Sequence, residues 1–226
     1  AAPAAAAGGG GGGGGAGTTT GGGAAATTTP TPSPTPAPAP GITTVPVTST
    51  NVPVTESSKK QEVVQGVTPQ DLGVSSITVD KVDVVQTGVA ETTVTASVST
   101  IDAIKQAIAL DQNVKDELDS IKAEISGQQS QAIAIQTKLE VFQVTSSETG
   151  KSAFVSKISL SFTAPDSLQN VNIVQVIPKS VAQSILDVIF SGKQPIVLQA
   201  DPVVQWFFDS VAKGETRDLS YTVKKK

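Results

Sequence analysis

The chain has 226 residues, a net charge of −4 and no cysteine, histidine or methionine. Without cysteine and histidine, disulfides, the usual zinc sites and Ser-His or Cys-His nucleophile pairs are excluded. The acidic balance argues against nucleic acid as a partner, and no apolar run is long enough to span a bilayer.

The first charged residue is Glu56, and what precedes it is mostly Ala, Gly, Thr and Pro. Residues 8–15 are all glycine, which loses the most backbone entropy on ordering and predicts a flexible coil. From Pro30 to Pro40 every second residue is proline, which predicts polyproline II. We therefore expect residues 1–41 to be a disordered or polyproline II tether.

The Thr, Ser and Pro content of this tether is also typical of O-glycosylated stalks. An unmodified spacer explains the same composition equally well, so both interpretations stay open. The candidate O-glycosylation sites are Thr27, Thr28, Thr29, Thr31, Ser33 and Thr35.

Residues 42–74 are predicted to be an extended linker. Prolines interrupt two β-like runs here, which restricts them to an edge strand or an extended segment. The segment could also lie along a sheet edge, either its own or that of a neighbouring copy. In the second case it would be an assembly strand that adds to the next subunit, and its contacting residues would be Val45, Val47, Val52 and Val54.

Residues 75–226 are expected to form one β-sandwich domain with an inserted helix. Ile77 to Val84 reads as a strand with a bulge, and Gln86 to Gly88 as a turn. Apolar residues then alternate from Thr92 to Ser99, which predicts a second strand and hence a hairpin.

Helical periodicity replaces the alternation over residues 101–126, with Asp111 as its one defect. This predicts one long helix that Gly127 ends. Its apolar stripe would pack on the domain's own sheet or pair with a second copy as a coiled coil. The stripe consists of Ile101, Ile104, Ile108, Val114, Leu118, Ile121 and Ile125.

The remaining residues predict further strands and one short helix, over 179–186. The two longest strands, 133–144 and 154–162, are expected at the centre of a sheet, on either side of a turn at 146–151. Shorter strands are expected at 171–177, 195–199, 203–208 and 217–223. The predicted fold class is mainly β, an antiparallel immunoglobulin-like sandwich.

The last third carries a family resemblance. Asn170 to Pro178 is a strand that ends in proline, Asp201 to Trp206 places a Trp on a later strand, and Val211 to Val223 contains a Gly turn before the final strand. This order resembles the immunoglobulin-like conserved-repeat modules of archaeal and other prokaryotic secreted cell-surface proteins, over roughly residues 151–223. Such a resemblance implies a spacer, adhesion or assembly unit without catalysis, and the helix at 101–126 departs from it.

No catalytic, metal-binding or cofactor-binding residues are predicted. The acidic residues of the helix alternate with lysines as on a solvated face, and calcium and phosphate loops are missing. Trp206 is expected to fill the core, with stacking on a carbohydrate as the alternative.

We therefore expect a non-catalytic structural module of an exported cell-surface protein, located outside the cell. One alternative is a subunit of an extracellular filament or surface lattice (pilus-like or S-layer), and a second is a glycan-binding adhesin. The expected partners are other surface-protein copies or cell-envelope components. Because methionine is absent, we also expect a processed chain or a fragment, with any membrane anchor in a segment outside it.

Overall fold

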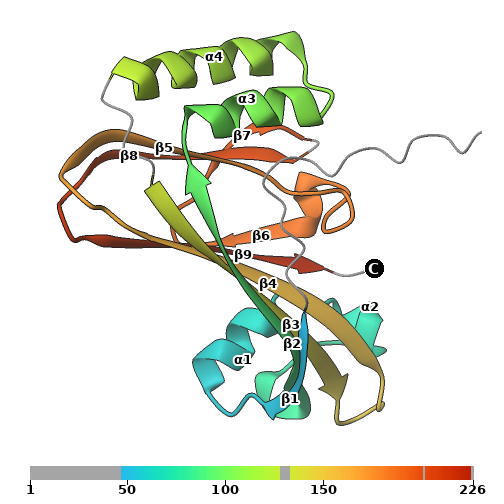
Figure 1. The fold of residues 1–226 in the computed structure, drawn as a ribbon. Helices are drawn as coiled ribbons and strands as arrows, with labels where there is room; N and C mark the ends of the chain where they lie inside the picture. Colours follow the sequence, from blue (N-terminus) through green and yellow to red (C-terminus); the bar gives the residue numbers. More distant parts are fainter. Residues whose placement is uncertain (1–46, 128–132, 201, 225–226) are drawn as a thin grey trace, which may run out of the picture. The chain divides into compact units, whose positions relative to one another are not determined.

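The structure, a computed structural model, describes residues 47–127, 133–200 and 202–224 (Figure 1). The predicted tether, residues 1–41, lies outside the described residues. Four α-helices occur in the described part, namely α1 (Ser57–Val64), α2 (Pro69–Leu72), α3 (Val98–Ala107) and α4 (Gln112–Gly127). The strands are β1 (Thr48–Pro53), β2 (Val82–Ala96), β3 (Ile133–Ser146), β4 (Ser152–Thr163), β5 (Leu168–Val176), β6 (Val188–Ser191), β7 (Ile196–Gln199), β8 (Val203–Val211) and β9 (Thr216–Lys224).

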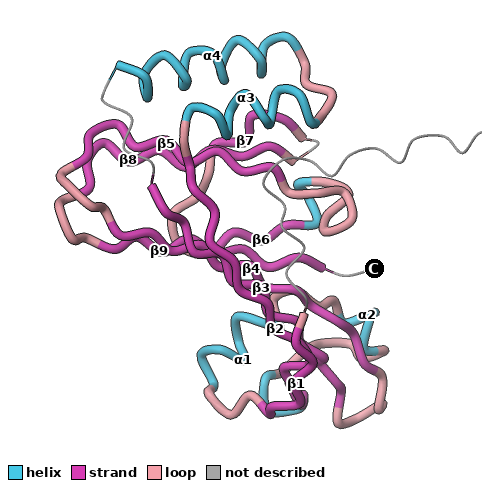
Figure 2. The backbone as a smooth tube through the Cα atoms, viewed as in Figure 1, coloured by secondary structure: helices cyan, strands magenta, loops and turns pink. Residues whose placement is uncertain are grey.

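The strands form two antiparallel sheets, so the prediction of a mainly β fold is confirmed (Figure 2). Sheet A has the order β1-β2-β3-β4-β9-β6, and sheet B has the order β5-β8-β7. The strands β3 and β4 lie in the middle of sheet A, as predicted, and the turn between them is where the sequence placed it.

An immunoglobulin-like order is not confirmed. In that order the last two strands share a sheet, whereas β8 belongs to sheet B and β9 lies between β4 and β6 in sheet A. The pairing is nested instead. The outer pair β4 and β9 belongs to one sheet, and the inner pair β5 and β8 belongs to the other.

Sheet A buries opposite faces at its two ends. At one end, Ile135 and Leu160 face sheet B and join the core between the two sheets. At the other end, Phe142 and Val155 point to the opposite face, where α1 and α2 cover them. Neighbouring residues of a strand point to opposite faces, so the odd-numbered Ile135 and the even-numbered Phe142 serve different cores on one regular strand.

Strand β2 also contributes residues to both cores, and it contains a bulge. Its register with β3 shifts between Gln86 and Gly88, so residue 87 is extra. Val84 joins the core under α1, and Ala96 packs against the core between the sheets. The predicted hairpin with a turn at Gln86 to Gly88 is therefore wrong. The turn-like residues form a bulge inside one strand of 15 residues.

The single long helix over 101–126 is also wrong, because the helix stops at Ile108. That residue has extended backbone angles, φ −133° and ψ 152°, and the chain turns back before Gln112. The two resulting helices, α3 and α4, form a layer over sheet B (Figure 1). Ile101 and Leu118 of this layer cluster with Val203 of β8. The predicted packing of the stripe on the domain's own sheet is thus confirmed.

The segment predicted as an extended linker, 42–74, contains β1, α1 and α2 in its described part. Val63 of α1 and Leu72 of α2 are fully buried in the core under α1. The helix α2 begins at a capping box between Thr68 and Asp71 and ends at Gly73, whose φ of 65° favours glycine. These residues belong to the folded body rather than to a linker.

The short helix predicted over 179–186 is replaced by two tight turns. The Pro178 carbonyl accepts hydrogen bonds from the Val181 and Ala182 amides, and a 3₁₀ turn follows at Ile185–Asp187. Ala182 is buried in the core between the sheets, while Leu186 is 85% exposed. The chain then enters β6, a strand that the sequence pattern did not predict.

Candidate functional site

The predicted assembly strand lies at an edge of sheet A. Strand β1 pairs with β2 of its own chain, from Thr48 opposite Val89 to Pro53 opposite Val85. Of its candidate contact residues, Val47 and Val52 are 49% and 55% exposed, whereas Val54 is buried in the core under α1. Val45 lies outside the described residues, as do the six candidate O-glycosylation sites listed above.

An apolar cleft opens where the helical layer meets sheet B. It lies between the first turns of α3, the end of α4, the start of β5 and the ends of β2 and β3. Its volume is about 290 Å³, near the lower limit for small-molecule sites. We call it the helix-side cleft. Its walls are Ala96, Ser97, Thr100, Ile101, Ile104, Ile125, Ile133, Ser167, Leu168, Gln169, Asn170, Val171, Asn172 and Val174.

Local hydrogen bonds fix the α3 wall of the cleft. The Ser97 amide donates to the Thr100 hydroxyl at 3.2 Å, and that hydroxyl donates to the Thr95 carbonyl at 3.0 Å. These bonds tie the helix start to the end of β2. Polar side chains that bond to nearby backbone groups in this way favour helix starts.

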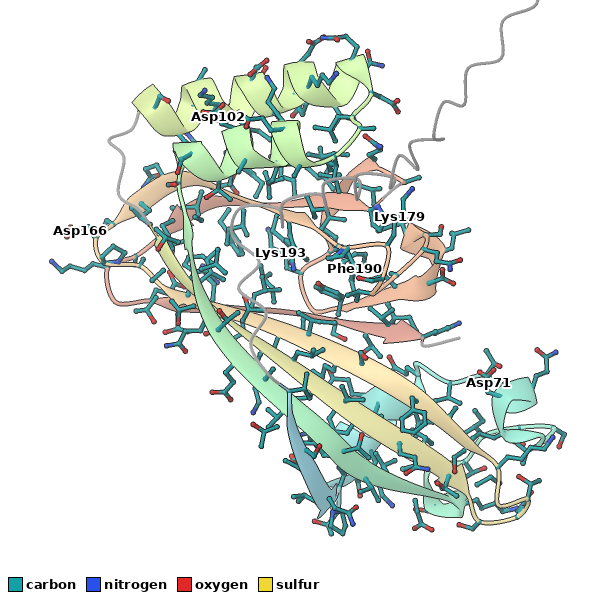
Figure 3. All side chains as sticks on the ribbon, turned by 45° about the vertical axis from the view of Figure 1, so that its right-hand side comes forward. Asp71, Asp102, Asp166, Lys179, Phe190 and Lys193 are labelled. Atoms are coloured by element: carbon teal, nitrogen blue, oxygen red, sulfur yellow. The ribbon has the colours of Figure 1, made fainter. Side chains whose placement is uncertain are left out.

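Two ion pairs hold α3 against α4. Lys122 contacts Asp102 at 2.6 Å, and Lys105 contacts Asp119 at 2.5 Å. Figure 3 labels Asp102 on α3. Each pair joins the two helices, so together they set how the helices lie against one another. They are partly exposed, and exposed ion pairs stabilise only weakly. Their effect is on geometry more than on total stability.

A polar network centred on the buried Asn172 and Gln205 reaches the floor of the cleft through Asn172. The Gln205 side chain donates to Asn172 Oδ1 at 2.6 Å. Asn172 Nδ2 in turn donates to Glu124 Oε2 of α4 and to the Asn170 carbonyl, both at 3.1 Å. Asn172 thereby uses both donor hydrogens and its acceptor. Because buried polar groups are costly without partners, this network fixes α4 over sheet B.

Asn170 is strained at the cleft wall. Its φ of 48° makes it the one non-glycine residue with positive φ among the residues that the structure describes. Asn tolerates this region better than most residues, yet such outliers gather at ligand sites and switches. The strain is held by the hydrogen bond that its carbonyl accepts from Asn172.

A second groove, which is polar, has a volume of about 460 Å³. Its residues Gln136 and Lys138 lie on the same face of sheet A as Phe142, at the end that α1 does not cover. Lys138 lies at its edge between Glu91 and Glu140, at 3.6 and 3.7 Å. The lining residues are Glu91, Thr92, Thr93, Gln136, Thr137, Lys138, Ser159 and Ser161, none of them aromatic.

The single tryptophan fills the core, as predicted. Trp206 is 1% exposed, and its indole N–H donates to the Lys193 carbonyl at 3.0 Å. Phe190 packs edge-on against it (Figure 3). Nearby, burial raises the pKa of Tyr221, and its hydroxyl accepts a hydrogen bond from Gln175. Neither ring faces the solvent, so neither is placed to stack on a sugar.

Within residues 47–127, 133–200 and 202–224, His, Cys, Asp and Glu side chains form no group of three that could hold a metal ion. Of the helices in this part, none is long and apolar enough to cross a membrane.

Sequence reasoning missed the helix-side cleft. Its walls come from three separate stretches of the chain, 96–104, 125–133 and 167–174, and no linear pattern marks such a meeting point. The Asn170 to Asn172 spacing was its only local sign. Comparison with known proteins adds no family: no family model, no curated protein and no solved structure matches the chain.

Proposed function

We propose that this protein is a non-catalytic structural module of an exported cell-surface protein, displayed on an N-terminal stalk. The observation that carries the proposal is the division of charge along the chain. The first charged residue, Glu56, directly precedes α1, so no charged side chain occurs among the 55 residues before it. An uncharged Gly, Thr and Pro region before a β-rich body suits a spacer that displays a domain.

The surface chemistry of the body supports a structural role. Charged side chains pair across elements, as in Lys157 with Glu62 at 2.6 Å and Lys59 with Glu140 at 3.1 Å. Both pairs tie α1 to sheet A. In these contacts the charged side chains join elements of the fold to one another.

The family resemblance is kept as part of this proposal. Residues 151–223 contain six strands, β4 to β9, which supply both layers of a sandwich. We infer a module akin to the immunoglobulin-like conserved repeats of archaeal surface proteins in role, with its own strand order.

The proposal is tested by locating the protein in its source organism. Antibodies raised against the folded body, residues 47–224, should label intact cells, and an antibody against a cytoplasmic protein should label only permeabilised ones. If the antibodies against the body also label only permeabilised cells, the surface assignment is refuted. The stalk is tested separately: O-glycans would raise the intact mass above the 22.9 kDa of the bare chain.

An alternative function is a subunit of a filament or lattice, and the sheet edges favour it. Edge strands β1 and β7 both lack charged residues, which commonly protect such edges. β7 also exposes Ile196 and Val197, at 55% and 46%. The test is sedimentation of the chain at high concentration: assembly that Val52→Lys or Val197→Lys abolishes would support it, and a monomer throughout would exclude it.

A second alternative, a glycan-binding adhesin, would use the polar groove on sheet A. Its rows of hydroxyl and amide side chains suit a polyhydroxylated ligand. Because the groove lacks aromatic rings and Trp206 is buried, sugars should leave Trp fluorescence unchanged in any case. Binding should instead depend on Gln136 and Lys138, and a glycan array that gives no signal would exclude this function.

A further inference from the structure

The helix-side cleft is pre-formed rather than a gap between loose elements. Its α3 wall is bonded to β2 through Thr100, and its floor is bonded to α4 through Asn172. The two helices share an apolar cluster with Val203 of β8, and the ion pair between Lys122 and Asp102 also joins them. A pocket with fixed walls loses little entropy when a ligand enters.

The lining of the cleft sets the charge of its occupant. Aliphatic side chains dominate, with Ile101, Ile104 and Ile125 on the helices and Ile133 on β3. No charged side chain is among the described residues that line it. A charged ligand would therefore lose its hydration without gaining an opposite charge, which is costly.

Polar groups at the rim set a second requirement. The side chains of Ser167, Gln169 and Asn170 make no hydrogen bond to any other described residue, and all three are exposed beside the cleft. They offer hydroxyl and amide groups to a ligand that reaches the rim. Pockets of this kind use a few such groups to orient an apolar ligand.

We propose that the helix-side cleft is a binding site for a small uncharged molecule that has an aliphatic body and a hydroxyl or amide group at one end. The aliphatic body contacts the isoleucines, and the polar end bonds to the rim side chains. The strained Asn170 holds the rim in place, which gives its positive φ of 48° a role. This site is independent of the proposed structural role, since none of its lining residues comes from β1 or β7, the two edge strands of the assembly alternative.

The test uses the full chain with isotope-labelled isoleucine methyl groups, followed by NMR during titration with cyclohexanol. We expect saturable shifts of Ile101, Ile104, Ile125 and Ile133, and none at Ile77, which packs in the core under α1. Cyclohexanecarboxylate, which has the same ring and a negative charge, should bind at least about tenfold more weakly because its charge must be desolvated.

A matched pair of variants locates the site. Ala96→Phe fills the cleft and should weaken cyclohexanol binding by about tenfold or more, since the ring occupies the same volume. Ala134→Phe is the control. Ala134 is exposed on β3 next to Ile133, on the opposite face of sheet A, so this variant should bind like the wild type.

Several results would overturn the proposal. These are the absence of saturable shifts in the wild type, shifts that extend equally to Ile77, and equal affinity for the alcohol and the carboxylate. Shifts of the cleft isoleucines with protein concentration alone would assign the cleft to a second copy of the chain. If Ala96→Phe does not fold, the comparison of the two probes on the wild type still decides.

Discussion

The exchange of buried faces along sheet A is tested most directly by two phenylalanines. Phe142 on β3 and Phe154 on β4 lie in adjacent register positions of the same hairpin. Phe142 is completely buried under α1, with the Lys59 ammonium 5.4 Å from its ring centre. Phe154 points to the other face and is 45% exposed.

The structure therefore predicts very different costs for the same substitution. Phe142→Ala removes a fully buried ring and should cost about 3–5 kcal/mol, a large fraction of the roughly 5–15 kcal/mol that stabilises a typical domain. Phe154→Ala loses only partial burial and should cost about 1–2 kcal/mol, because the cost scales with the apolar area returned to water.

Urea unfolding followed by circular dichroism measures both values, with the wild type and Phe154→Ala as references. A similar slope against urea in all three proteins would show that the comparison is of stability alone. The reasoning fails if Phe154→Ala costs as much as Phe142→Ala, since both faces of that end would then be equally buried.

Three further predictions concern the polar and titratable groups. Asn172→Ala and Gln205→Ala should each cost about 1–3 kcal/mol in urea unfolding, because each leaves buried partners unpaired. The double variant should cost less than the sum of the two, and strict additivity would show that the network does not couple these residues. The chain has one tyrosine, and burial raises the pKa of Tyr221. Alkaline absorbance titration should therefore show no tyrosinate near pH 10 in the folded protein, whereas the tyrosine of the urea-unfolded chain should ionise there. The free energy of unfolding should fall as pH rises above the unfolded-state pKa of about 10, a decline that Tyr221→Phe should lack. Hydrogen bonds from Thr68 lower the pKa of Asp71, so Asp71→Asn should be less stable than the wild type at neutral pH. The difference in stability should shrink as pH falls through that lowered pKa. A difference that persists in acid would contradict the charge-based explanation.

The sequence predicted the β-rich fold and the central β3–β4 hairpin because alternation there is long and regular. Ile133 to Val144 and Phe154 to Phe162 carry the pattern, and the turn at 149–151 contains a glycine with positive φ. Alternation could not distinguish one bulged strand from two short ones at Gln86 to Gly88. The residues of a bulge and of a turn are the same types.

The break between α3 and α4 was concealed for a different reason. Both helices present apolar residues to sheet B, so the spacing from Ile104 to Leu118 stays compatible with a single helix. The sign of the break was Asp111, which immediately precedes α4, a position where Asp is favoured. In a single helix the same residue is only a defect in the apolar stripe. In α2, the capping residues Thr68 and Asp71 are an equally clear sign of a helix start.

The candidate site was the least predictable part. The edge position of β1 followed from the sequence, because proline marks edge strands. The helix-side cleft and the network through Asn172 depend on contacts between residues such as Glu124 and Gln205, which only the fold brings together.

The sharing of β2, β3 and β4 by two cores has a kinetic consequence. In sheet A only β3 and β4 are joined by a short turn, whereas β1 and β2 are separated by helices and β4 pairs with the distant β9. Closing long loops is entropically slow, so we expect the β3–β4 hairpin to nucleate folding of both halves at once. In chevron experiments, Val144→Ala should then slow folding, while Leu219→Ala in β9 should mainly speed unfolding.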